Sequence, residues 1–240
     1  MTTQSETRPL TLTERGILSL LAIKSSVFKD LRTAAKEEPE NKMLCKCILA
    51  GLFHLGGTTS KESDFVLAIP PGEEKQYSQT ERLYIRAVKV YEDTPDKSEE
   101  FLLQALQTDP LQVAALKLLL EFYYFTGSQE KLLQAALDGL ASLKTLCGTE
   151  LGTANPQFLR RAMGYVHGMV AFGYEENGSY ELAMREALVA LSINEDDVWA
   201  IHAVAHCYEM ANKPEEGAKW LEEREEVWSK SYLTVHVRWH

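Results

Sequence analysis

A repeat with a period of 34 residues is the strongest constraint on how this chain can fold. The segment "HGMVAFGY" at 167–174 is followed 34 residues later by "IHAVAHCY" at 201–208. Upstream, "RLYIRAVK" at 82–89 and "LKLLLEFY" at 116–123 stand the same distance apart. A period of this length predicts a stack of helical hairpins, in which each repeat buries its apolar face only against its neighbours.

The period divides most of the chain into repeat units. We predict units at about 79–112, 113–146, 164–197 and 198–231, and the start of a further helix before residue 240. The register slips between the second and third units, so a longer helix end and a loop are expected across 141–157. Residues 1–78 are less regular and are predicted to form one or more irregular helical pairs that cap the stack. Because no strand-like alternation of apolar and polar residues persists, the predicted class is all-α.

Small and aromatic residues recur at matching positions of the repeat. Ala171 and Ala205 stand where the second helix of a hairpin packs close against the first, and Tyr174 and Tyr208 close the gap between helices. This pattern resembles the tetratricopeptide repeat, W-x2-L-G-x2-Y, in a weakened form. The resemblance implies an α-solenoid of helical hairpins that winds as a right-handed superhelix around a concave groove.

The order of the segments resembles one family in particular, the tetratricopeptide repeat protein 38 family. The resemblance is carried by "QTERLYIRAVKVYE" at 79–92, "TDPLQVAALKLLLEFYYFTG" at 108–127, "ALSINEDDVWAIHAVAHCYEM" at 190–210 and "VHVRWH" at 235–240. Its most specific part is the pattern D-x-W-x-x-H-x-x-A-H, which runs from Asp197 to His206. The resemblance implies the fold of the repeat region and no particular reaction.

The end of the chain differs from that family. Members continue for roughly as much again after the pair that matches Trp239 and His240, whereas this sequence stops at what reads as the start of another helix. The resemblance therefore implies a C-terminally truncated chain whose last repeat lacks a neighbour. We expect a weak, exposed edge near Trp228, Tyr232 and Trp239.

Charge and composition narrow the class of partner. With 25 Lys and Arg against 35 Asp and Glu, the net charge is −10, which disfavours nucleic acids and anionic lipids because both require clustered cations. No apolar run reaches the roughly 18 residues of a membrane span, and the polar N-terminus shows no signal-peptide pattern. Four scattered cysteines do not form a disulfide framework. We expect a cytoplasmic protein whose partner is a protein or a peptide, with neither nucleic acid nor membrane binding.

Histidines gather near the C-terminus. His202, His206 and Glu209 fall within an arc of about 60° on a helix, so their side chains share one face. His236 and His240 repeat the four-residue spacing on the next predicted helix. Two histidines at i and i+4 can chelate one metal ion, and a nearby glutamate can serve as a third ligand or as a general base. These five residues are the candidate metal ligands of one hypothesis, a metal-dependent or acid/base enzyme.

The other hypothesis is a binding scaffold. An H-x3-H pair on a helix is common by chance, and the zincin motif H-E-x-x-H is absent. The candidate partner-binding groove then consists of Trp199, His202, His206 and Glu209, extended by Phe172 and Glu175. Its acidic and aromatic character suits a peptide with basic or apolar side chains. We favour this hypothesis, a scaffold that recognises a peptide or protein, with no catalytic residues, no metal and no cofactor.

One structural feature separates the two hypotheses. A metal or acid/base site is expected to hold its histidines in a closed pocket, with hydrogen-bonding partners behind the rings. A scaffold is expected to present the same histidines along an open groove. The burial of His202 and His206 is therefore the observation that matters most.

Overall fold

The computed structural model describes residues 8–147 and 154–240. The regular structure of these residues is helical, which confirms the predicted all-α class. The helices of the first half are α1 (Leu12–Leu21), α2 (Val27–Glu37), α3 (Lys42–Leu55), α4 (Lys61–Leu67), α5 (Gln79–Val90), α6 (Pro95–Thr108), α7 (Val113–Phe125) and α8 (Gln129–Cys147). Those of the second half are α9 (Pro156–Glu176), α10 (Tyr180–Ile193), α11 (Val198–Met210), α12 (Pro214–Glu222), α13 (Glu225–Trp228) and α14 (Thr234–Trp239). Two short 3-10 helices span Pro39–Asn41 and Glu73–Gln76.

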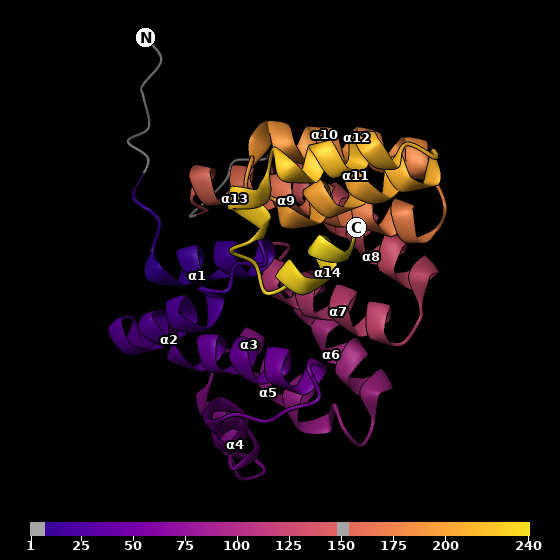
Figure 1. The fold of residues 1–240 in the computed structure, drawn as a ribbon. Helices are drawn as coiled ribbons and strands as arrows, with labels where there is room; N and C mark the ends of the chain where they lie inside the picture. The colour runs from indigo at the N-terminus through magenta and orange to yellow at the C-terminus, as the bar shows by residue number, and fades with distance from the viewer. Residues whose placement is uncertain (1–7, 148–153) are drawn as a thin grey trace.

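Consecutive helices of the repeat region pack against each other as neighbouring pairs (Figure 1). Helices α5 and α6 both lie within the predicted unit 79–112, and α7 and α8 together run from Val113 to Cys147. Helices α11 and α12 both lie within 198–231. The pair α9 and α10 begins at Pro156, before the predicted unit that starts at 164.

The slip in the period is taken up by two long helices. Helix α8 continues to Cys147 and α9 already begins at Pro156, so helix covers much of the expected insertion, and residues 148–153 of that insertion lie outside the described part of the chain. Helix α9 can begin this early because the Asn155 side chain accepts the Gln157 N–H at 3.0 Å. A proline in the first turn of a helix leaves no helical hydrogen bond unmade.

The turns inside three hairpins use residues that tolerate a left-handed backbone. Gly127, Gly178 and Asn212 have φ angles of 68°, 74° and 58°, and each stands just after the first helix of a pair. Glycine adopts this conformation without a steric penalty, and asparagine does so more readily than most residues. Gly178 and Asn212 are 34 residues apart, so the repeat includes the turns as well as the helices.

Small residues bring α9, α10 and α11 close together. A Cβ atom added to Gly168 of α9 would lie 2.2 Å from a carboxylate oxygen of Asp197, which caps the start of α11. Ala183, Ala187 and Ala190 of α10 are fully buried between the same helices. This close packing fixes α11 against α9, and both helices contribute to the site described below.

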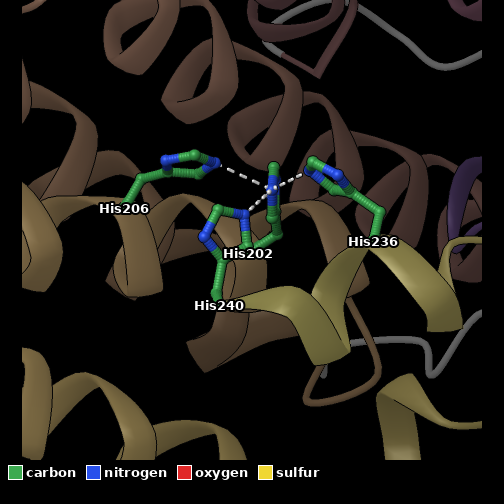
Figure 2. A group of neighbouring side chains, drawn as sticks. All are labelled: His202, His206, His236 and His240. Carbon is green, nitrogen blue, oxygen red and sulfur yellow. Dashed lines mark hydrogen bonds between the residues drawn. The ribbon is translucent and has the colours of Figure 1, made fainter.

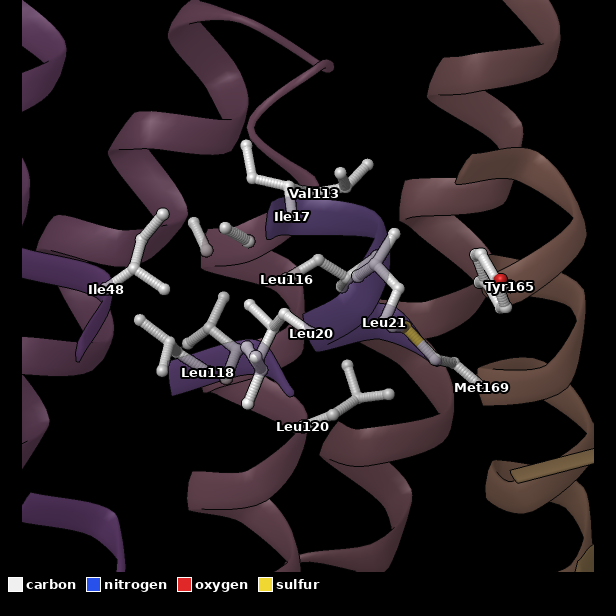
Figure 3. Packing of buried hydrophobic residues seen from close by; sticks show 14 of the residues in the cluster. Ile17, Leu20, Leu21, Ile48, Val113, Leu116, Leu118, Leu120, Tyr165 and Met169 are labelled. Carbon is white, nitrogen blue, oxygen red and sulfur yellow. The ribbon is translucent and has the colours of Figure 1, made fainter. Parts of the chain in front are cut away.

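A continuous apolar core joins the N-terminal helices to the repeat region (Figure 3). Leu20 and Leu21 of α1 are fully buried in the cluster that also holds Leu116 of α7 and Met169 of α9. Burial of an aliphatic side chain of this size contributes about 1.5–3 kcal/mol. The helices before residue 79 are therefore part of the main core.

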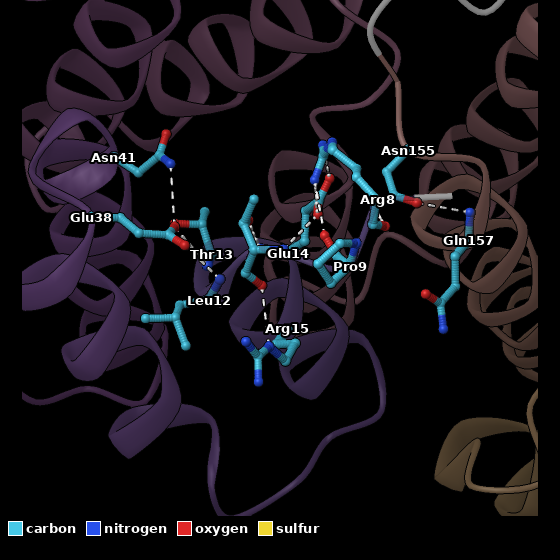
Figure 4. A network of polar contacts seen from close by, with 11 residues as sticks. Arg8, Pro9, Leu12, Thr13, Glu14, Arg15, Glu38, Asn41, Asn155 and Gln157 are labelled. Carbon is cyan, nitrogen blue, oxygen red and sulfur yellow. Dashed lines mark hydrogen bonds and ion pairs between the residues drawn. The ribbon is translucent and has the colours of Figure 1, made fainter. Parts of the chain in front are cut away.

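A polar network fixes the start of α1 (Figure 4). The Glu38 carboxylate accepts the Leu12 N–H at 2.6 Å, the Thr13 N–H at 3.0 Å and the Thr13 hydroxyl at 2.6 Å. The Arg8 carbonyl accepts a hydrogen bond from the Asn155 side chain at 3.1 Å. The N-terminal segment is thereby tied both to α2 and to the start of α9.

The C-terminal segment returns to the N-terminal helices. The Ser25 N–H donates to the Lys230 carbonyl at 3.0 Å, and the Tyr232 N–H donates to the Ile23 carbonyl at 3.2 Å. The turn between α1 and α2 therefore holds the segment that leads into α14. Figure 1 shows α14 near the middle of the molecule, where its histidines reach those of α11.

The edge expected at the end of the chain is exposed only in part. Trp228 is 5% exposed, because α13 packs against α11, and its indole N–H donates to the Leu221 carbonyl at 2.8 Å. Val235 and Trp239 of α14 are 86% and 77% exposed. The expectation of an exposed edge is thus wrong for Trp228 and correct for the outer face of α14.

Candidate metal centre

Four histidines from two helices converge on one point (Figure 2). His202 and His206 project from α11, His236 projects from α14, and His240 follows α14 directly. The Nε2 atom of His202 lies 2.9 Å from Nε2 of His236, 2.9 Å from Nε2 of His206 and 3.3 Å from Nε2 of His240. One nitrogen from each ring lies within 4.8 Å of all the others. We call these four residues the histidine cluster.

Hydrogen bonds cannot satisfy all the close nitrogen contacts of the histidine cluster at once. A neutral imidazole has one N–H and one lone pair, so Nε2 of His202 can make only one hydrogen bond among its three nitrogen neighbours. A tetrahedral ion with nitrogen ligands at about 2.0–2.1 Å would hold those nitrogens about 3.3 Å apart. The three separations from Nε2 of His202 lie at or below this value, while the four ligand nitrogens as a group lie within 4.8 Å of one another. The donor set therefore fits a divalent transition-metal ion, and binding would require small movements of the rings.

Two carboxylates stand on the opposite side of the rings, at the Nδ1 atoms. Oε1 of Glu175 lies 3.6 Å from Nδ1 of His206, and Oε2 of Glu209 lies 3.7 Å from the same atom. Oε2 of Glu209 also lies 3.3 Å from Nδ1 of His240. Carboxylates in this position favour the tautomer with the proton on Nδ1, which leaves the Nε2 lone pair free for a metal. Glu209 is thus placed behind the rings, whereas the sequence suggested a ligand or a general base.

Burial keeps the imidazoles neutral. His202 is 2% exposed, and burial, followed by the neighbouring His206 and His236, lowers its pKa well below 6.5. Burial and the nearby His240 lower the pKa of His206 to about 4. His202 and His206 are therefore neutral at neutral pH, and neutral imidazole is the protonation state that binds metal.

Burial acts in the opposite direction on the nearby Glu175. Its desolvation, together with Glu176 and Glu209, raises the pKa of Glu175 to about 8. Among the described residues, neither Oε2 of Glu175 nor Nδ1 of His202 has a hydrogen-bond partner, although both atoms are buried. Buried polar atoms normally have a partner, so these two atoms favour a functional site over packing alone.

A cavity of about 550 Å³ opens beside the histidine cluster. His202, His206 and His236 form one part of its wall, and the rest comes from α2, α3, α7, α9 and residues 232–233. Aromatic rings dominate the wall, with the rings of Phe172 and Trp199 only 4.2 Å apart. The volume is in the range of sites for small organic ligands.

All the candidate residues of the sequence lie in this one region. Phe172, Trp199 and Glu175 are 3%, 7% and 8% exposed, and they touch the histidine cluster or the adjoining cavity. His236 and Glu209 are exposed, as are Tyr124 and Phe125 at the edge of the cavity. The site is therefore a partly open pocket, between the closed pocket expected of a metal site and the open groove expected of a scaffold.

Equivalent positions of the repeat supply the cluster. His202 and His236 are 34 residues apart, as are His206 and His240. Glu175 and Glu209 have the same spacing. Stacked repeats place equivalent residues side by side, so this spacing is the signal that predicts their convergence.

Other cavity residues carry no such signal. Phe28 of α2 and Leu52 of α3 line the cavity although they belong to the irregular part of the sequence, far from the histidines. Glu176 also lines it and had no role in the sequence hypotheses. Only the return of the C-terminal segment to α1 and α2 brings these residues to one place.

The fold and the site together define a class: an all-helical protein with a histidine cluster, centred on the buried His202, beside a cavity. In comparisons with known proteins, no family model matches this chain and no solved structure matches it. Among the described helices, none combines the length and the apolar character that crossing a membrane requires.

Proposed function

We propose that this chain is a metal-binding α-solenoid of the tetratricopeptide type, which holds one divalent transition-metal ion at the histidine cluster, beside the adjoining cavity. The observation that carries the proposal is the convergence of four Nε2 atoms, three of them within 3.3 Å of Nε2 of His202. The paired packing of the helices and the 34-residue spacing of the histidines support the repeat architecture.

The donor set favours zinc. Four imidazoles suit Zn, Cu, Fe and Ni better than Mg or Ca, which prefer oxygen ligands. Tetrahedral coordination is the preference of zinc in proteins, and four imidazoles supply the number of ligands that it requires. Glu209, behind the rings of His206 and His240, would offset part of the charge of a divalent ion.

The ion and the chain have separate roles. An ion bound by His202, His206, His236 and His240 would have the complete four-ligand shell that is typical of a structural site, and it would join α11 to the C-terminal segment. Glu175 and Glu209 orient the rings that hold it. The aromatic wall excludes water and thereby strengthens electrostatic interactions inside the cavity.

A second candidate function is peptide recognition without catalysis. One observation favours it: Tyr124 and Phe125, at the end of α7, line the cavity and are 42% and 60% exposed. Exposed aromatic side chains at the edge of a cavity are typical anchors for a partner chain. In this function the histidine cluster stabilises the pocket that the peptide enters.

Metal analysis tests the first proposal. The purified protein, loaded with zinc and passed through a desalting column, is expected to retain about one equivalent of zinc by mass spectrometry. A double variant, His202→Ala with His206→Ala, is expected to lose it. The matched control is His167→Asn, which removes an imidazole of α9 that contacts Glu186 at 2.6 Å, away from the cluster.

A second variant guards against misfolding. His236→Ala with His240→Ala removes one ligand from α14, which has only six residues, and one from the residue after it, so the helical content by circular dichroism is expected to stay at the wild-type level while zinc is lost. Wild-type protein that retains no zinc, nickel or iron at micromolar concentrations would contradict the proposal. Equal retention in the wild type and both double variants would do the same.

A further inference from the structure

We propose that the cavity beside the histidine cluster binds an organic cation with an apolar body, such as an amine on an aromatic or aliphatic chain. This inference rests on the proposed function, because it names the class of ligand that shares the cavity with the ion. Three features of the cavity support it: its size, its aromatic wall and the carboxylate of Glu176, which has no counter-ion among the described residues.

The size of the cavity sets the scale of the ligand. A volume of about 550 Å³ matches small organic molecules, whose sites usually span about 300–1,000 Å³. The wall is formed by both halves of the chain, since Phe28 and Leu55 face the same space as Trp199 and His202. A ligand in this space contacts both halves of the chain, so part of its surface leaves water.

A row of aromatic rings forms one wall. The ring centroids of Phe125 and Tyr124 are 5.5 Å apart, those of Tyr124 and Phe172 are 5.7 Å apart, and those of Phe172 and Trp199 are 4.2 Å apart. The row continues to His202, whose ring centroid lies 6.0 Å from that of Trp199. Aromatic rings bind apolar groups by burial and attract cations through their π faces.

The carboxylates of the cavity wall differ in whether they have an ion-pair partner. Two carboxylates line the cavity, those of Glu121 and Glu176. Glu121 is paired with the buried Lys117, at an Nζ to Oε1 distance of 2.5 Å. The side chain of Glu176 has no hydrogen bond and no ion pair to any residue that the structure describes, and partial burial raises its pKa. No lysine or arginine belongs to the described cavity wall.

A cation is the ligand charge that this arrangement accepts. An ammonium group near Glu176 would satisfy an acceptor that now has no partner, in surroundings where an ion pair is stronger than in water. Glu209 lies directly behind two ligands of a bound divalent ion and would offset part of its charge. An anionic ligand would meet no lysine or arginine in the described cavity wall.

Three probes that share one apolar body separate the alternatives. They are 4-phenylbutylamine, 4-phenylbutanol and 4-phenylbutyrate, which carry a positive charge, no charge and a negative charge at pH 7. Titration calorimetry with the zinc-loaded full chain is expected to show saturable binding of the amine, about tenfold tighter than that of the alcohol. Tighter binding of phenylbutyrate, equal binding of amine and alcohol, or no saturable binding of the amine at millimolar concentration would overturn the proposal.

A matched pair of variants assigns the charge effect to Glu176. Glu176→Gln keeps the shape of the side chain and is expected to weaken amine binding about tenfold while leaving alcohol binding and zinc content unchanged. Glu181→Gln, an exposed position at the start of α10, is expected to change neither. Unchanged amine affinity in Glu176→Gln would overturn the proposal.

The same titrations on protein stripped with a chelator separate this inference from the proposed function. Preference for the amine that persists in protein unable to bind metal would leave the cavity ligand supported and the metal proposal contradicted. A protein that holds zinc but shows no preference for the amine would contradict only the inference about the cavity ligand.

Discussion

His202 lies at the centre of the histidine cluster, because its Nε2 atom is the one that approaches all three of the other Nε2 atoms. His202 is also the buried member of the cluster, at 2% exposed. One proton can bridge this nitrogen to only one of its three nitrogen neighbours, whereas a metal ion can bind all four nitrogens. The metal proposal therefore depends first on the Nε2 atom of His202.

Glu209 gives a prediction about the groups behind the rings. Glu209→Gln keeps the side-chain shape but removes the charge that lies 3.3 Å from Nδ1 of His240, so zinc affinity is expected to fall about 10- to 100-fold. Competition with a zinc chelator dye measures the change. Glu216→Gln, an exposed position on α12, serves as the control and is expected to leave the affinity unchanged. An unaltered affinity in Glu209→Gln would mean that the carboxylate does not act on the rings.

Glu38 gives a prediction about stability and pH. Burial tends to raise the pKa of Glu38, but hydrogen bonds from Thr13, Leu12 and Asn41 outweigh it and hold the pKa below the usual 4.5. A carboxylate with a lowered folded-state pKa stabilises the protein above its unfolded pKa, and that contribution is lost as the pH falls through the folded value. Glu38→Gln is therefore expected to cost about 1–3 kcal/mol at pH 7 and progressively less below about pH 4.5.

Urea denaturation of wild type and Glu38→Gln at several pH values measures this difference. Glu40→Gln, an exposed position in the adjacent 3-10 helix, is the matched control and is expected to have no effect. A difference between Glu38→Gln and wild type that grows as the pH falls would contradict the sign of the argument.

At the scale of elements, α14 is the helix that depends most on the proposed ion. It has only six residues, Thr234–Trp239, and of these only Val237 is buried. A helix this short does not form in isolation, because nucleation costs more than a single turn returns. An ion bound by residues of both α11 and α14 would join the two helices and close one side of the cavity.

This dependence is measurable by amide hydrogen exchange. Zinc is expected to slow exchange in residues 234–239, and a chelator is expected to restore fast exchange, because opening of α14 then no longer breaks metal bonds. The buried helix α3 serves as an internal control whose exchange is expected to stay constant. Identical exchange of α14 with and without zinc would contradict a role for His236 and His240 as ligands.

The sequence predicts the regular helices better than the irregular ones. The period of 34 residues places the pairs α5–α6 and α11–α12, because apolar and small residues recur where the hairpins must pack. It places the start of α9 too late, since the cap at Asn155 acts locally and lies outside the repeat. The sequence does not predict the burial of Trp228 for a related reason, because α13 interrupts the regular succession of helical pairs.

At the scale of the whole molecule, the site exists because the chain returns on itself. Hydrogen bonds from Ser25 to Lys230 and from Tyr232 to Ile23 join the N-terminal helices to the C-terminal segment. Phe28 and Leu52 thereby line the same cavity as His202. Periodicity in the sequence identifies the histidines, but contacts between segments about 200 residues apart leave no periodic signal.

X-ray absorption spectroscopy of the zinc-loaded protein measures the ligands of the proposed ion directly. We expect a shell of four nitrogen ligands at about 2.0 Å, with the outer-shell scattering of imidazole rings, and its loss in the variant with His202→Ala and His206→Ala. A first shell composed mainly of oxygen, or a spectrum that is unchanged in that variant, would contradict a metal centre at the histidine cluster.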